Sequence, residues 1–185
     1  MQIKTENNLL EPLRRDFVSA SQRTGLHISE DTEFYIANTL RRFGLSEEFF
    51  RIYDRNMPFT FMYKRAKEAD NSYERFLGSK NLGDAIMYVG GFFPESMEGS
   101  FDFYIGMGRE GYFEAAGIAK KGKPIYREMA EKLPKIVDTL NEIKESTETV
   151  SNMHIMDIYN RWLKTRSPRL KTILKKKNVI PLKDP

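Results

Sequence analysis

The sequence predicts a single all-α domain, a bundle of about eight helices with kinks at Pro58 and Pro134. Apolar side chains recur at the spacing of an α-helix through most of the chain. No stretch alternates apolar and polar residues as a half-buried strand would, and no repeat of fixed period occurs. With 185 residues, 40% of them hydrophobic, the chain can bury one substantial core. We therefore expect one helical domain over residues 1–177 and an extended tail over 178–185.

Glycines and a capping serine place the first two helices. Apolar spacing predicts a helix over 9–20, and Gly25 is its expected stop. Ser29 is the predicted N-cap of the second helix, because its hydroxyl can accept an amide hydrogen of the first turn and acidic residues follow it. Gly44 suits the position just after that helix.

The next helices are expected on either side of a proline. A third helix should follow Ser46, and Pro58 should break or kink it because proline lacks an amide hydrogen and clashes with the preceding turn. A further piece is expected over 59–69. Asn71 or the residue before it can cap a short helix that ends at Gly78, where a new helix should open.

Prolines also mark the helices of the second half. One helix is expected over 101–119, and Pro124 fits the first turn of a long helix that runs to about residue 146. Pro134 lies inside this helix and should kink it. Two further helices are expected over 151–163 and, after a Ser-Pro pair, over 168–174.

The segment 83–117 differs from the rest of the chain in its glycine content. It contains eight of the twelve glycines, and the stretch from Gly106 to Gly111 matches the G-x-G-x-x-G pattern of dinucleotide sites. Such a site needs a parallel sheet, which the sequence does not predict. Glycine inside a helix costs about 0.5–1 kcal/mol relative to alanine, so several together indicate close contact between backbones. We therefore expect two helices packed across small residues, with Gly83 on the first and Gly108 on the second.

The same segment holds the candidate ligand-binding residues. Acidic, basic and aromatic side chains gather in it and could line a pocket for an anionic ligand. Arg109 is predicted to pair with Asp84 or Glu95, because its planar guanidinium can donate two hydrogen bonds to one carboxylate. That pair would either pin the two helices together or belong to a ligand site. The candidate residues are Asp84, Phe92, Phe93, Glu95, Tyr104, Arg109 and Tyr112.

This segment also resembles part of a bacterial protein family. The stretches LGDAIMYVGGFFPES and DFYIGMGREGYFEAAG resemble a group of uncharacterised bacterial helical proteins of similar length. The resemblance is confined to these stretches. It implies a self-contained bacterial domain and transfers no activity, cofactor or site residue.

Basic residues are concentrated at the C-terminal end of the chain. Residues 155–185 contain nine Lys and Arg against two Asp, a net charge of +7 in a chain whose total is +4. Lysines in a last helical turn complement the helix dipole, but the same charge could bind nucleic acid. In that alternative the contact residues are Arg161, Lys164, Arg166, Arg169, Lys171, Lys175, Lys176 and Lys177.

Several catalytic and metal chemistries lack their residues. The chain has no cysteine, which excludes a disulfide framework, a thiolate zinc site and a cysteine nucleophile. Its two histidines, His27 and His154, stand in no metal-binding spacing, so we expect no metal and no cofactor. An enzyme is a further alternative, with Asp84, Glu95 and Tyr104 as its acid–base groups.

The sequence thus favours a non-catalytic helical module that binds a partner protein or a small ligand at 83–117. No apolar run approaches the length of about 20 residues that spans a membrane, and no export signal is recognisable. We therefore expect a cytoplasmic protein without membrane contact. A glycine-lined helix face could also meet a second copy of itself in a homodimer.

Overall fold

The described residues of the computed structural model form seven α-helices and one short 3₁₀-helix, and no strand. The structure describes residues 10–44, 49, 52–53, 57–97, 100–147, 162 and 165–176. The predicted all-α class is confirmed for this part of the chain, with one helix fewer than expected. Most of the helices predicted after Ser46 and over 151–163, and all of the tail over 178–185, lie outside these residues.

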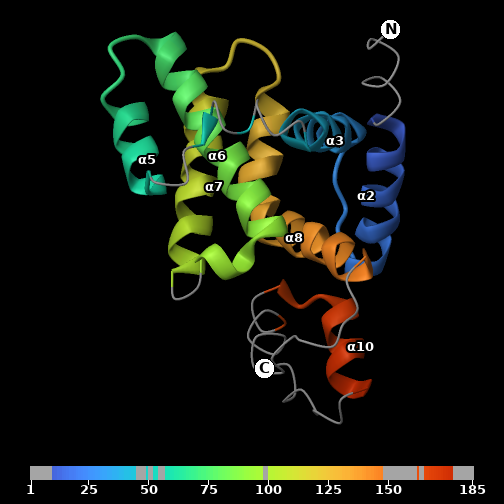
Figure 1. Cartoon of the computed structure of the whole chain (residues 1–185). Coiled ribbons are helices and arrows are strands. Elements are labelled where there is room, and N and C mark those ends of the chain that lie inside the picture. The colour runs from blue at the N-terminus through green and yellow to red at the C-terminus, as the bar shows by residue number, and fades with distance from the viewer. Residues whose placement is uncertain are drawn as a thin grey trace, which may run out of the picture.

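Three long helices form the centre of the molecule. They are α6 (Ser72–Phe92), α7 (Phe101–Ile118) and α8 (Lys123–Thr147). Shorter helices surround them, namely α2 (Leu10–Thr24), α3 (Glu30–Gly44), α5 (Phe59–Lys67) and α10 (Pro168–Lys176), and the 3₁₀-helix η1 (Pro94–Met97) follows α6. Figure 1 shows α5 on one side of α6 and α7, with α2 on the opposite side of the molecule. The helix α10 packs against α2.

Several predicted helix ends are confirmed. Gly25 ends α2 in the left-handed conformation, with φ +73. The Ser29 hydroxyl accepts the backbone N–H of Thr32 at 3.3 Å and caps α3. The Asn71 side chain accepts the backbone N–H of Glu74 at 2.9 Å and caps α6. These ends are set by residues close in sequence, which is why they are predictable.

Of two predicted breaks, the structure confirms one. Pro58 stands just before α5 as its N-cap, so a new helix begins after this proline as predicted, without a kink inside α5. The predicted end at Gly78 is wrong, because α6 runs through it without interruption. A glycine inside a helix costs only about 1 kcal/mol, and this one lets α5 approach, since a Cβ at Gly78 would lie 3.0 Å from the Ala66 Cβ. Pro134 does lie inside α8, which continues past it.

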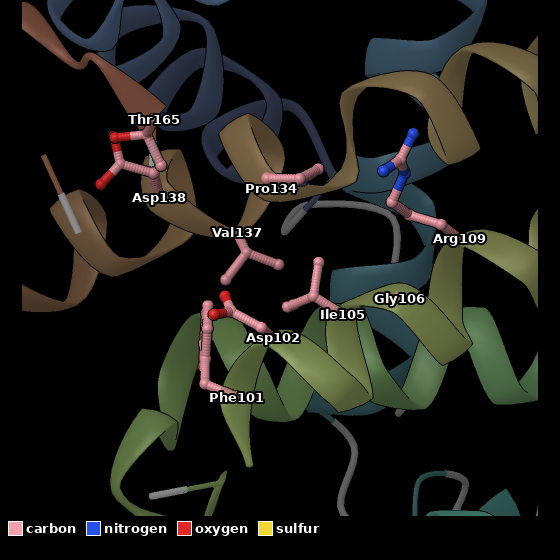
Figure 2. A pocket seen from close by; sticks show the side chains of 9 residues that line it. All are labelled: Phe101, Asp102, Ile105, Gly106, Arg109, Pro134, Val137, Asp138 and Thr165. Carbon is pink, nitrogen blue, oxygen red and sulfur yellow. The ribbon is translucent and has the colours of Figure 1, made fainter. Parts of the chain in front are cut away.

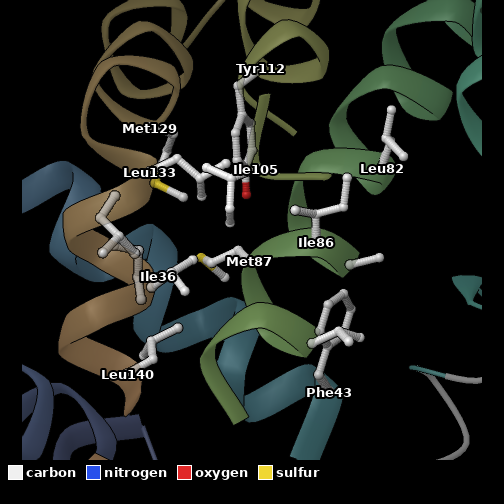
Figure 3. Close-up of a cluster of buried hydrophobic side chains, with 14 of the residues drawn as sticks. Ile36, Phe43, Leu82, Ile86, Met87, Ile105, Tyr112, Met129, Leu133 and Leu140 are labelled. Atoms are coloured by element: carbon white, nitrogen blue, oxygen red, sulfur yellow. The ribbon is translucent and has the colours of Figure 1, made fainter. Parts of the chain in front are cut away.

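The main core lies where α3, α6, α7 and α8 meet (Figure 3). Ala85, Ile86 and Met87 of α6 have no exposed surface, and Met129 and Leu133 of α8 are equally buried. Burying a side chain of this size stabilises the fold by about 1.5–3 kcal/mol. Because α6 is covered on almost every side from Ser79 onward, it is the helix around which the others are arranged.

Glycines let α6 and α7 approach closely, as the sequence predicted. A Cβ at Gly83 would lie 2.8 Å from the ring of Tyr112, and one at Gly111 would lie 2.7 Å from the backbone oxygen of Ser79. A Cβ at Gly108 would lie 2.8 Å from the side chain of Ile86 in α6 and 2.9 Å from that of Leu133 in α8. Each of these distances is shorter than van der Waals contact allows, so the packing depends on the missing side chains.

Replacing Gly111 should therefore separate the two helices. We expect Gly111→Ala to lower the free energy of unfolding by about 1–3 kcal/mol, because the new methyl group would meet backbone rather than a movable side chain. Gly117→Ala is the matched control in the same helix, since a Cβ there has no atom within 4 Å. It should stabilise the protein by about 0.5–1 kcal/mol. Equal effects of the two variants in urea denaturation would contradict the close-packing argument.

A carboxylate of α8 holds the start of α3. Glu128 accepts the backbone N–H of Ser29 at 3.0 Å and its hydroxyl at 2.6 Å. Lys132 lies 3.0 Å from the same carboxyl group and also donates to the backbone oxygen of His27. Burial raises the pKa of Glu128, but these hydrogen bonds and one from Thr32 outweigh it and lower the pKa from 4.5 to about 2.

This lowered pKa predicts an acid-dependent contribution to stability. A carboxyl group that is more acidic in the folded state contributes fully above the unfolded pKa, near 4.5, and loses its contribution as the pH falls toward 2. At neutral pH, Glu128→Gln should lower the free energy of unfolding by about 2–3 kcal/mol. The difference from the native protein should shrink below pH 4.5. Glu131→Gln, an exposed position on the same helix, is the control, and a deficit independent of pH would contradict the assignment.

Candidate functional site

The structure does not bring the seven predicted ligand-binding residues together. They divide among the core, the loop after α6, the contact of α7 with α5 and the contact of α7 with α8. Tyr104 packs edge-on against Phe59 of α5, with ring centroids 5.2 Å apart. The predicted residues are therefore not one pocket, and each group has its own role.

Asp84 and Tyr112 meet in the core. The Asp84 carboxylate is fully buried and accepts the hydroxyl of Tyr35 at 2.6 Å and that of Tyr112 at 2.8 Å. The Lys80 ammonium lies 2.6 Å from its other oxygen. Burial, together with the charge of Asp84, raises the pKa of both tyrosines well above the ordinary value. The cluster links α3, α6 and α7, and the spacing of Lys80 and Asp84 by one helical turn was the sequence signal for its ion pair.

Arg109 does not form the predicted pair with Asp84 or Glu95 in the described part of the chain. Its Nε donates instead to the backbone oxygen of Ala130 at 2.9 Å. In a regular helix that oxygen accepts the N–H of the residue four positions later, which here is Pro134 and has none. Arg109 therefore supplies the hydrogen bond that the proline removes from α8.

The loop after α6 attaches that end of the helix to α8. The Glu95 carboxylate lies 3.4 Å from the Lys144 ammonium, and this ammonium also lies 5.9 Å from the ring centroid of Phe93. Phe92 packs against Tyr88 with ring centroids 5.2 Å apart. Phe92 thus packs at the end of α6, whereas Phe93 and Glu95, which follow it, are exposed.

A cavity of about 250 Å³ lies between α7 and α8, beside the Arg109 side chain. Figure 2 shows Ile105 and Asp102 reaching from α7 toward Val137 of α8. The volume lies just below the range of drug-sized ligand pockets, about 300–1,000 Å³, and suits a smaller molecule. The lining residues are Phe101, Asp102, Ile105, Gly106, Arg109, Pro134, Val137, Asp138 and Thr165.

Two residues that weaken their own helices line this cavity. Proline costs a helix interior about 3 kcal/mol and glycine about 1 kcal/mol relative to alanine. Gly106 differs from Gly108 and Gly111, because a Cβ at Gly106 has no atom within 4 Å. No packing contact explains this glycine, which is exposed and lines the cavity. Sequence reasoning singled out neither Gly106 nor Pro134 as a site residue, although the proline inside a predicted helix was a usable signal.

Thr165 of the C-terminal segment lines the cavity, and a predicted nucleic-acid residue of the same segment pairs with α8 nearby. Arg169 lies 2.6 Å from Glu145 and 3.6 Å from Asp138, and its side chain is only 11% exposed. Asp138 itself is buried and lines the cavity, next to Thr165. The guanidinium of Arg169 thus joins α10 to α8, and its contact with nucleic acid stays a prediction.

The other predicted nucleic-acid residues are placed in part. Lys171 and Lys175 are exposed on α10. The guanidinium of Arg166 lies 4.7 Å from the ring centroid of Trp162. Arg161, Lys164 and Lys177 lie outside the described residues, as does the side chain of Lys176.

No protein-family model, curated protein or solved structure matches the chain. The resemblance of the 83–117 segment to bacterial proteins stays a prediction. Among the described helices, none is both long and apolar enough to cross a membrane. Within the same ranges, no three His, Asp or Glu side chains gather as they would around a metal ion.

The pairing of Arg109 with the carbonyl of Ala130 predicts a double-mutant result. Arg109→Ala should lower the free energy of unfolding by about 1–3 kcal/mol, because it leaves that carbonyl without a donor. In a Pro134→Ala background the same substitution should cost much less, since the restored amide at position 134 can donate to the carbonyl. Additive effects of the two substitutions in chemical denaturation would contradict this account.

Proposed function

We propose that the protein is a non-catalytic, cytoplasmic binding module whose ligand occupies the cavity between α7 and α8. The observation that carries the proposal is the meeting of Gly106 and Pro134 at this cavity. Each residue weakens its own helix, and no neighbouring side chain fills the space beside Gly106. A bound molecule would account for the retained space.

The lining sets the chemistry of the ligand. Phe101, Ile105 and Val137 offer an apolar wall, and the guanidinium of Arg109 stands at one side. Only its Nε is engaged by Ala130, and its terminal nitrogens have no partner among the described residues. The ligand is therefore a small molecule with an apolar body and one group that accepts hydrogen bonds from Arg109.

The separation of the predicted acid–base groups supports binding rather than catalysis. Asp84 is enclosed in the core by its tyrosine and lysine partners. Glu95 lies in η1, after α6, and pairs with Lys144 of α8, whereas Tyr104 packs against α5. General acid–base catalysis needs such groups within hydrogen-bond reach of one substrate.

A side chain introduced at Gly106 tests the proposal. Gly106→Leu should fill the cavity from α7 and remove ligand binding, while the protein stays folded because the position has room. Gly117→Leu is the matched control, because it lies in the same helix, also has open space, and does not line the cavity. The readouts are native mass spectrometry of gently purified protein and a thermal-shift screen of small metabolites.

Retention of a bound mass, or of a thermal shift, in Gly117→Leu but not in Gly106→Leu supports the proposal. Loss of binding in both variants, or in neither, would contradict it. The absence of any bound mass and any thermal shift in the native protein would also contradict it.

A further inference from the structure

We propose that the groove between α5 and α6 binds a basic, amphipathic helical segment of a partner protein. This surface is separate from the α7–α8 cavity, and the two share no lining residue. The inference therefore does not depend on the ligand proposed above.

Six of the eleven residues that line the groove are apolar, and we call these six its floor. The groove has a volume of about 580 Å³, which is large enough for two or three side chains of a docked helix. Two of its floor residues are methionines, whose flexible thioether side chains fit differently shaped partners. The apolar floor residues are Ile52, Met57, Met62, Ala66, Ala69 and Gly78.

The rim of the groove is acidic. Three carboxylates, those of Glu68, Asp70 and Glu74, stand against the single guanidinium of Arg65. Glu68 lies 3.8 Å from Lys64 of its own helix. The side chains of Asp70 and Glu74 are exposed and make no hydrogen bond or ion pair to any described side chain. Two unpaired carboxylates beside an apolar floor match a helix that carries both Lys or Arg and large apolar residues.

The opposite side of α5 is held in place, so the groove has a fixed wall. Lys67 lies 2.6 Å from Glu114 and 3.2 Å from Glu110 of α7, and the Tyr63 hydroxyl donates to Glu110 at 2.6 Å. Arg75 of α6 donates to the backbone oxygen of Lys67 at 2.7 Å. These contacts tie α5 to its neighbours on the side away from the groove and leave the acidic rim uncovered.

The positive charge of the chain is concentrated away from the groove. Residues 155–185 carry +7 and the whole chain +4, so residues 1–154 carry −3 and attract a basic peptide weakly over their whole surface. Binding at the groove must therefore be distinguished from this general attraction by a charge-matched control. The occupant that fits is a Lys- or Arg-bearing helix, whereas an acidic peptide would be drawn to the basic C-terminal segment instead.

Fluorescence anisotropy with a defined peptide tests the groove. The probe is a labelled amphipathic peptide of about 14 leucine and lysine residues, and its counterpart with glutamate in place of lysine is the control peptide. The lysine peptide should bind the full-length native protein. Asp70→Lys combined with Glu74→Lys should weaken binding at least about tenfold.

Two further variants separate the groove from general charge attraction. Asp16→Lys combined with Glu131→Lys changes the net charge equally at exposed positions on α2 and α8, and should leave the affinity within about twofold. Met62→Gln keeps the charge but makes the floor polar, and should weaken binding several-fold. Circular dichroism verifies that each variant is folded.

No binding of the lysine peptide would overturn the inference. Equal losses in the rim variant and the charge-matched control, or full affinity in Met62→Gln, would also overturn it. Tighter binding of the glutamate peptide would point to the basic C-terminal segment and against the groove. Gly106→Leu should bind the lysine peptide normally, so failure of the cavity proposal leaves this test unaffected.

Discussion

The hydroxyl of Tyr112 reaches the buried carboxylate of Asp84 because the neighbouring Gly83 has no side chain. A Cβ at Gly83 would lie 2.8 Å from the tyrosine ring, so any larger residue would push α7 away from α6. A buried carboxylate must keep its partners, since losing one from a buried charge pair costs about 3–5 kcal/mol. The second hydroxyl comes from Tyr35, which places α3 against the same cluster. The spacing of α3, α6 and α7 thus follows from one glycine and one carboxylate.

The three glycines of α7 from 106 to 111 have different physical reasons. Gly108 and Gly111 are required by close neighbours, while Gly106 faces open space on the α8 side. On that side Pro134 removes a hydrogen bond within α8, and Arg109 replaces it from α7. The helices α7 and α8 are thus linked by the hydrogen bond from Arg109 to Ala130, and the cavity lies beside that bond. Both the cavity and its polar edge arise from this arrangement.

The peripheral helices combine apolar contacts with ion pairs to α8. Phe17 of α2 and Leu174 of α10 have no exposed surface. Arg23 of α2 donates from Nε and one terminal nitrogen to Glu142 of α8, both at 2.8 Å, and Arg169 of α10 lies 2.6 Å from Glu145. The carboxylates of these pairs are largely buried, so removing either arginine would leave a buried charge without its partner.

The sequence by itself determined the all-α class, the caps at Ser29 and Asn71, the end at Gly25 and the close packing of the glycine-rich helices. Caps and left-handed ends depend on residues within one turn, and helical periodicity repeats over many residues, so both are readable locally. Only the tertiary structure decided the partners of Asp84 and Arg109 and the cavity between α7 and α8. These features depend on contacts between residues that are distant in sequence. Arg109, for example, donates to the backbone carbonyl of Ala130, which has no helical donor because residue 134 is proline. The continuation of α6 through Gly78 was decided in the same way, because the close contact with α5 at this position accompanies only a small local cost of one glycine.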